Sequence, residues 1–94
     1  AVDTSNVIID SFNPTLYRSA KYMVTSSNGV DASILEAQLV QHAGIVALNT
    51  VSNVNTGVNS ITFYANVYNG TVNFIAKGST TSNQLRIQRT YFNV

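Results

Sequence analysis

The side chains that could carry out acid–base chemistry are few, and their spacing separates them. His42 is the only histidine, and Asp31 and Glu36 are predicted to share the strand that ends at it. Because side chains alternate between the faces of a strand, the odd spacing of these carboxylates places them on opposite faces. Asp3 and Asp10, also at odd spacing, are predicted to be solvated surface charges. We therefore expect no enzyme and no catalytic residues, and a structural, hydrogen-bonded role for His42.

Composition narrows the function classes further. The 94 residues include no cysteine, and no histidines or carboxylates have metal-site spacing, so we expect no metal and no cofactor. Five Lys and Arg residues against four Asp and Glu give a net charge of +1, too low to bind nucleic acid by counterion release. No apolar stretch approaches the roughly 18 residues that span a bilayer, so a membrane partner is not expected either.

The elements predicted to position a functional site are β-strands joined by tight turns. Asn-Gly between alternating segments is the strongest short-range signal of a hairpin, because a type I′ turn needs positive φ at both central residues. A two-residue loop at Asn28-Gly29 predicts Tyr22 opposite Leu35 on an apolar face, and Lys21 opposite Glu36 on the other. This first hairpin is therefore predicted with one buried face.

A second hairpin is predicted by the same signal. A two-residue loop at Asn69-Gly70 places Tyr68 opposite Thr71 and makes one face of the pair fully apolar. On the other face, Tyr64 lies opposite Ile75, so two large apolar side chains occupy positions where solvent is expected. This outward pair is the first indication of an interaction surface.

The remaining segments complete an all-β pattern. Further strands are predicted at residues 7–9, 44–51 and 84–92, with a polar loop over 52–60. About seven strands in a chain of this length predict a single domain over residues 1–94, an antiparallel β-sandwich or small barrel. Residues 1–6 are predicted to form an extended N-terminal arm that can add to the sheet edge of a neighbour.

The aromatic residues are the most informative about binding. Low charge and exposed tyrosine are typical of the centres of interfaces, although the sandwich could instead bury both sides of the second hairpin. Two arginines of the last strand could contact an acidic neighbouring subunit or form a solvated face. The candidate interface residues are Tyr64, Tyr68, Ile75, Arg86, Arg89, Tyr91 and Phe92.

Motifs along nearly the whole chain carry a resemblance to a known family. They are Asp10-Ser11-Phe12, Tyr17-Arg18-Ser19-Ala20-Lys21-Tyr22, the Asn28-Gly29 turn, the segment from Ile34 to His42, and Arg89-Thr90. The chain resembles small β-modules in structural proteins of tailed bacteriophages, especially the marine and cyanobacterial T4-like viruses. Their pattern is approximately S-F, Y-R-S-A-K-Y, a D-G or N-G turn, E-L-L-x-x-H-x-G and a terminal R-T.

Two departures from that pattern concern the middle strands. Glu36 follows a leucine instead of preceding a leucine pair, and Ala43-Gly44 stands where Asp-Gly or Asn-Gly is usual. The resemblance implies a virion component, such as a capsid decoration protein or a surface module of a tail or fibre. It implies other virion proteins as partners, self-association in a symmetric assembly and a location on the virion surface. It brings no catalytic residues.

A second hypothesis is a glycan-binding module that recognises the host from a tail fibre. In that case Tyr64, Tyr68 or Tyr91 stacks on sugar faces, while Asn and Ser side chains of the polar loops bind hydroxyl groups. The two hypotheses predict different positions for the aromatic side chains. Assembly is favoured by aromatic residues that lie along strands, with the Asn-rich loops at the strand ends, and glycan binding by an aromatic platform bordered by polar loops.

Overall fold

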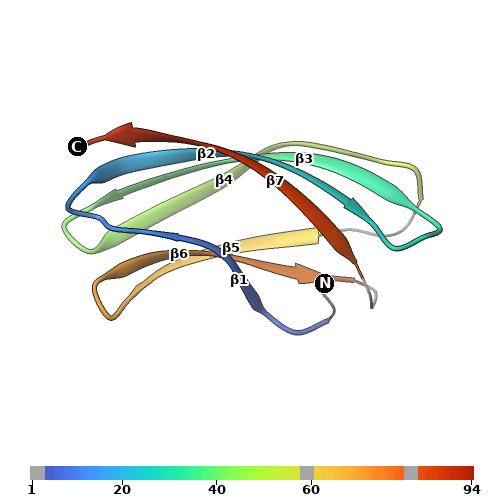
Figure 1. The fold of residues 1–94 in the computed structure, drawn as a ribbon, viewed down its shortest axis with the longest axis horizontal. Helices are drawn as coiled ribbons and strands as arrows, with labels where there is room; N and C mark the ends of the chain where they lie inside the picture. The colour runs from blue at the N-terminus through green and yellow to red at the C-terminus, as the bar shows by residue number, and fades with distance from the viewer. Residues whose placement is uncertain (1–3, 58–60, 80–82) are drawn as a thin grey trace.

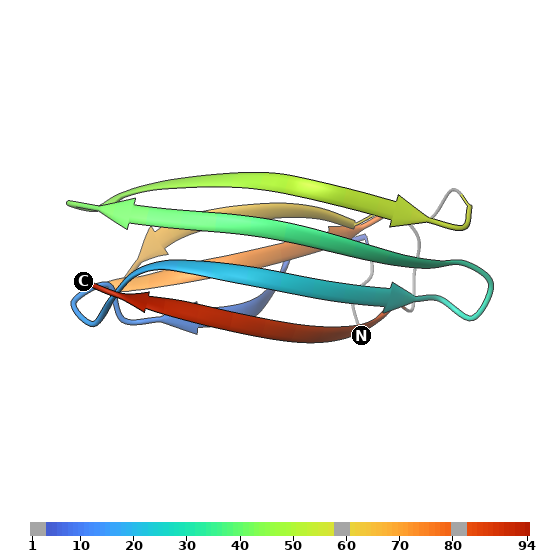
Figure 2. The ribbon, with the colours of Figure 1, turned by 90° about the horizontal axis from the view of Figure 1, so that it is seen from above.

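The fold consists of two antiparallel sheets packed face to face (Figure 1). The computed structural model describes residues 4–57, 61–79 and 83–94. Strand order is β1-β6-β5 in one sheet and β4-β3-β2-β7 in the other, as the view from above shows for the larger sheet (Figure 2). The seven strands are β1 (Val7–Phe12), β2 (Tyr17–Ser27), β3 (Ala32–His42), β4 (Ile45–Asn55), β5 (Ile61–Tyr68), β6 (Thr71–Gly78) and β7 (Gln84–Asn93). The predicted all-β fold of about seven antiparallel strands is therefore confirmed, and of the two predicted architectures the chain has the sandwich rather than the barrel.

The core lies between the two sheets and is formed by alternate residues of the strands. In β2 and β3, burial alternates residue by residue, because successive side chains point to opposite faces. At its centre the rings of Tyr22 and Phe74 stack with centroids 3.9 Å apart, which joins the middle strands of the two sheets. The buried apolar residues are Phe12, Ala20, Tyr22, Val24, Leu35, Ala37, Leu39, Ile61, Phe63, Val72, Phe74 and Ala76.

The hairpin of β5 and β6 has the predicted register. Tyr68 lies opposite Thr71, and Tyr64 lies opposite Ile75. Asn69 and Gly70 both have positive φ, 53° and 72°, as a type I′ turn requires. This register fixes which aromatic side chains face outward.

The register predicted for β2 and β3 is wrong by two residues. Tyr22 lies opposite Ala37 instead of Leu35, because the loop contains four residues and not two. The Asn28 side-chain oxygen accepts hydrogen bonds from the backbone amides of Val30 and Asp31, and the Asn28 amide donates to the Asp31 carbonyl. The asparagine thus closes the loop with its side chain, as an Asx-type turn does.

A shift of two residues leaves every side chain on the predicted face. Lys21 lies opposite Gln38, but its ammonium group still forms an ion pair of 3.1 Å with Glu36, which is now its diagonal neighbour. The placement of Lys21 directly opposite Glu36 is therefore wrong, whereas the predicted contact between these opposite charges on the outer face is confirmed.

The third hairpin joins β3 and β4 through Ala43 and Gly44, which have φ of 52° and 80°. Beyond it, β4 extends to Asn55, so the polar loop predicted over residues 52–60 is wrong for 52–55. A bulge opposite Glu36 and Ala37 interrupts the register of this pair. The last three residues of that predicted loop, 58–60, lie outside the described part of the chain.

The N-terminal strand is longer than predicted. β1 extends to Phe12 instead of ending at residue 9, with a bulge between Ile8 and Asp10. Of the arm predicted over residues 1–6, residues 1–3, including Asp3, lie outside the described residues. Residues 4–6 are exposed and precede β1.

Candidate functional site

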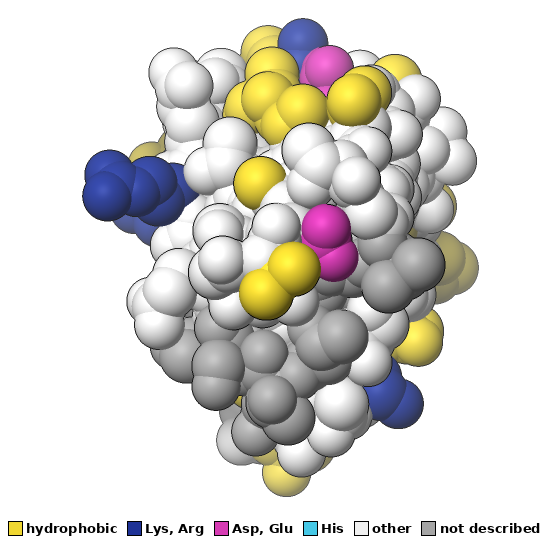
Figure 3. Space-filling view, turned by 90° about the vertical axis from the view of Figure 1, so that its right-hand side faces the viewer, with side chains coloured by type: hydrophobic (Ala, Val, Ile, Leu, Met, Phe, Trp, Pro, Cys, Tyr) yellow, Lys and Arg dark blue, Asp and Glu magenta, His cyan; other side chains and the backbone are white. Residues whose placement is uncertain are grey.

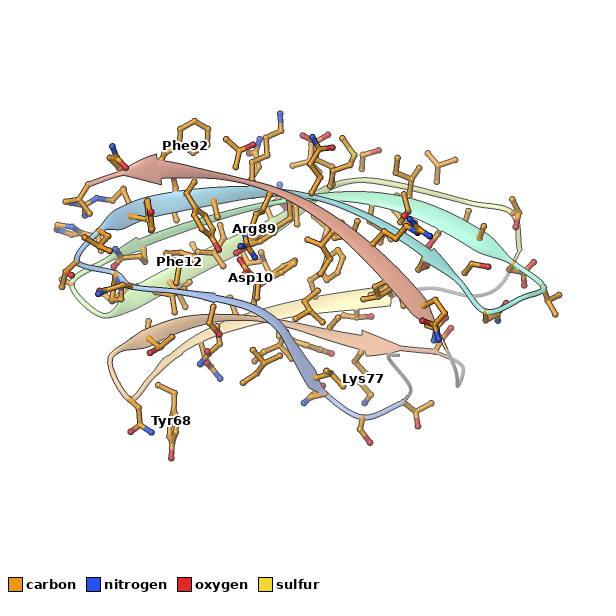
Figure 4. The ribbon with its side chains drawn as sticks, in the orientation of Figure 1. Asp10, Phe12, Tyr68, Lys77, Arg89 and Phe92 are labelled. Atoms are coloured by element: carbon orange, nitrogen blue, oxygen red, sulfur yellow. The ribbon has the colours of Figure 1, made fainter. Side chains whose placement is uncertain are left out.

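The seven predicted interface residues lie in three separate places. Tyr64, Tyr68 and Ile75 lie on the outer face of the three-stranded sheet, and Arg86 and Phe92 on the outer face of the four-stranded sheet. Arg89 and Tyr91 bind a buried carboxylate between the sheets. Figure 4 shows this separation, with Tyr68 below the layers, Phe92 above them and Arg89 between them.

A row of apolar side chains crosses the outer face of the three-stranded sheet. Ile8 of β1 lies opposite Ile75 of β6, which in turn lies opposite Tyr64 of β5. Ile8 is 57% exposed and Tyr64 is 46% exposed. Tyr68 lies on the same face, four residues further along β5. We call these four residues, Ile8, Tyr64, Tyr68 and Ile75, the Tyr64 face.

A neutral polar ladder crosses the same face. The Ser11 hydroxyl donates to Asn73 Oδ1 at 2.9 Å, and Asn73 Nδ2 donates to Asn66 Oδ1 at 2.9 Å. Each side chain comes from a different strand, so the ladder links all three strands in addition to the backbone bonds. It supplies rigidity without adding charge to the Tyr64 face.

The outer face of the four-stranded sheet carries a second set of exposed apolar side chains. Ile34 lies directly opposite Val54, and Val40 directly opposite Ala47. In Figure 3, hydrophobic side chains gather along the upper edge of the molecule, above this sheet, with a basic and an acidic side chain beside them. We call this surface the Phe92 face; its large exposed apolar residues are Met23, Ile34, Val40, Ile45, Val54 and Phe92.

An open groove of about 560 Å³ lies on the Phe92 face. Phe92, which is 50% exposed, lines it together with Val40. The hydroxyl or amide side chains that line it are Ser19, Gln38 and Asn49, and the ammonium group of Lys21 is beside them. A larger open groove of about 890 Å³ lies near the loop between β2 and β3. Of the large exposed apolar residues of the Phe92 face, only Phe92 had been predicted from sequence, although strand alternation indicates Ile34 and Val40.

The carboxylate of Asp10 accepts hydrogen bonds from three side chains. Its Oδ2 accepts hydrogen bonds from the hydroxyls of Tyr22 at 2.8 Å and Tyr91 at 2.6 Å, and its Oδ1 accepts one from Arg89 Nη1 at 2.8 Å. Asp10 is 8% exposed, so its prediction as a solvated surface charge is wrong. The bulge between Ile8 and Asp10 is the reason, because it turns Asp10 inward, opposite Phe74.

The electrostatics of this cluster follow from burial. Burial, followed by the hydrogen bond to Asp10, raises the pKa of both the Tyr22 and Tyr91 hydroxyls well above the ordinary value. The Arg89 guanidinium also lies 5.4 Å from the Tyr91 ring centroid. Because Tyr22 and Tyr91 remain protonated donors and Arg89 supplies the positive charge, the carboxylate links the sheets. We call these four residues the Asp10 clasp.

His42, whose structural role stays a prediction, is exposed at the end of β3. Its Nδ1 contacts Arg18 Nη1, and the same guanidinium approaches the Gln41 carbonyl. Gln41 is buried and donates from Nε2 to the carbonyls of Pro14 and Tyr17, both at 2.9 Å. These bonds fasten the loop between β1 and β2 to the end of β3.

In residues 4–57, 61–79 and 83–94, no group of three or more His, Cys, Asp or Glu side chains is arranged to hold a metal ion. The same ranges contain no helix of the length and hydropathy that crossing a membrane requires.

Comparison of this chain with known proteins identifies no similar protein. Neither protein-family models, nor curated proteins, nor solved structures match this chain.

Proposed function

We propose that this protein is a non-enzymatic structural module of a virion, which docks onto neighbouring subunits through the Tyr64 face. The observation that carries the proposal is the apolar row of Ile8, Ile75 and Tyr64 across one sheet. Single exposed apolar residues are ordinary, but a contiguous row on an outer face is typical of a surface that another protein covers.

The energetics suit a repeating assembly. Burying a large apolar side chain completely contributes about 1.5–3 kcal/mol, so a row of half-exposed side chains supports only a weak contact by itself. Many identical copies in a symmetric particle engage together, and the effective concentration then raises the avidity of the contact. The ladder of Ser11, Asn73 and Asn66 supports this use, because it keeps the sheet rigid before binding.

The virion setting comes from the resemblance of the Tyr17–Tyr22 motif and the strand ending at His42 to phage β-modules. Within that setting, we infer a capsid decoration protein or a surface module of a tail or fibre. Other virion proteins are the partners.

The test is co-sedimentation of the purified protein with particles of its source. The variant Tyr64→Ser/Ile75→Ser is expected to weaken binding at least about tenfold, since it removes two of the three apolar side chains of the row. Phe92→Ser, on the opposite outer face, is the matched control and should bind normally. Equal binding by the double variant contradicts the docking face, and absence of the chain from particles, measured by quantitative mass spectrometry, contradicts the virion setting.

A glycan-binding module remains the second candidate, and the groove on the Phe92 face is the observation that favours it. An aromatic ring beside hydroxyl and amide groups suits the apolar face and the hydroxyls of a neutral sugar. Tyr91 is a poor stacking residue, since its hydroxyl binds Asp10. Glycan-array binding that Phe92→Ser abolishes and Tyr64→Ser leaves unchanged supports this candidate over assembly.

A further inference from the structure

We propose that the β4 edge is a self-association site, at which a second copy of this chain adds antiparallel to Ile45–Thr50 about a twofold axis. The inference concerns the isolated protein and does not depend on the virion setting.

β4 is an open edge of the four-stranded sheet. Within the described part of the chain β3 is its only strand partner, and β4 forms one long side of the larger sheet (Figure 2). Nine of its eleven residues are exposed. One side of a strand in this position presents unpaired N–H and C=O groups, which another strand can bind.

β4 also lacks the features that keep sheet edges from pairing. Natural edge strands are usually protected by charged side chains, proline, short length or coverage. β4 has eleven residues and contains neither a charged residue nor proline. Its bulge begins only beyond Thr50, so the segment Ile45–Thr50 keeps an unbroken register with β3.

The other edges differ. β7 carries Arg86 and Arg89, and β1 has six residues, a bulge and the carboxylate of Asp10. β5 is also uncharged, but it is shorter and lies beneath β4, in contact with it. The side of the sandwich formed by β4 and β5 is therefore neutral along its whole length.

The neutrality of β4 favours a second copy of this chain as the strand that pairs with it. When two copies pair about a twofold axis, a strand of one copy lies antiparallel to the same strand of the other. Any charged residue on that strand therefore lies close to the same charge on the second copy. β4 has no charged residue, so twofold pairing at this strand brings only neutral side chains together. The inward side chains Val46 and Leu48 are only partly buried in the single chain. A second copy covers them along the open side of the core.

Sedimentation velocity of the purified chain, from micromolar to millimolar concentration, is the experiment. The wild type is expected to form a dimer as concentration rises. In Ala47→Glu/Asn49→Glu, both exposed edge positions acquire a carboxylate that faces the symmetry copy, and the dimer should weaken at least about tenfold.

Two controls separate edge pairing from general effects of charge. Gln38→Glu places the same charge on the same sheet face, one strand inward and directly opposite Asn49. Gln88→Glu places it on the outer face of the opposite edge strand, β7. Both should dimerise like the wild type. Urea unfolding of each variant shows that it is folded, and single Ala47→Lys replaces the double variant if that fails to fold.

Hydrogen exchange provides the second measurement. Amides of residues 45–50 should gain protection as concentration rises, with those of β7 unchanged. A wild type that stays monomeric at millimolar concentration overturns the proposal. So does a dimer that the edge variant leaves intact, or one that Gln88→Glu weakens equally.

Discussion

The Tyr91 hydroxyl of β7 donates a 2.6 Å hydrogen bond to Asp10 Oδ2 of β1, and so connects edge strands of different sheets. The Tyr91 ring also contacts the rings of Phe12 and Tyr17, with centroids 5.3 Å and 4.7 Å away. One side of the sandwich is thus closed by a polar clasp within an aromatic cluster.

Removal of the Asp10 carboxylate should destabilise the fold strongly. Asp10→Ala leaves the buried Tyr22 hydroxyl and the Arg89 guanidinium without their acceptor, and we expect a loss of about 2–4 kcal/mol in the free energy of unfolding. Urea unfolding measures it. Lys21→Ala, which breaks the more exposed Lys21–Glu36 pair, should cost no more than about 1 kcal/mol. Equal losses in the two variants would contradict a structural role for the clasp.

The clasp also predicts a dependence of stability on alkaline pH. The folded-state pKa values of Tyr22 and Tyr91 are raised above 10.0, the ordinary value that applies in the unfolded chain. The stability from the two protonated hydroxyls is therefore fully present below pH 10.0 and is lost as pH rises from there toward the folded values. Urea midpoints measured from pH 8 upward test this. In Tyr22→Phe/Tyr91→Phe the decline should be smaller, and an unchanged decline contradicts the assignment.

Ala43 is a position where substitution should stabilise the protein. Its φ of 52° is unfavourable for alanine, whereas asparagine adopts this region more readily. Ala43→Asn creates an Asn-Gly turn like that at Asn69-Gly70 and should add about 0.5–1 kcal/mol to the free energy of unfolding. Ala32→Asn, at an exposed residue without positive φ, should give no gain in the same thermal or urea unfolding.

The hydroxyls of Ser26 and Ser33 form a buried cross-strand hydrogen bond of 2.5 Å. Either single change to alanine leaves one buried hydroxyl without that partner, and should cost about 1–2 kcal/mol. The double variant should cost clearly less than the sum, because both polar groups are gone. A double-mutant cycle in urea measures the coupling, and additive losses would show that the pair does not interact.

The strands and their faces could be predicted from the sequence because strand alternation and the Asn69-Gly70 turn are local signals. The register of the first hairpin could not, because Asn28 uses its side chain to close a longer loop. An Asn-Gly pair indicates where the chain reverses. The loop length also depends on which backbone N–H groups bind the side-chain oxygen of the asparagine.

The interaction surfaces were predictable only in part. Tyr64 and Ile75 followed from a correct register, whereas Ile8 joins their row only through the pairing of β1 with β6, which is remote in sequence. The burial of Asp10 depends on a bulge that no local pattern signals. Arg89 and Tyr91 share strand parity with Leu85 and Ile87, a signal that indicates the inner face.

The contrast between the two long sides of the sandwich determines how far strand pairing can proceed. A filament that grows by sheet extension needs an adhesive edge at both ends of the sheet. Here the edge opposite β4 is β7, which presents Arg86 and is held against β1 by the Asp10 clasp. Once two copies have paired through β4, that edge is covered in both of them, and β7 does not provide another. The expected product is a closed pair of fixed size, protected from runaway fibre growth.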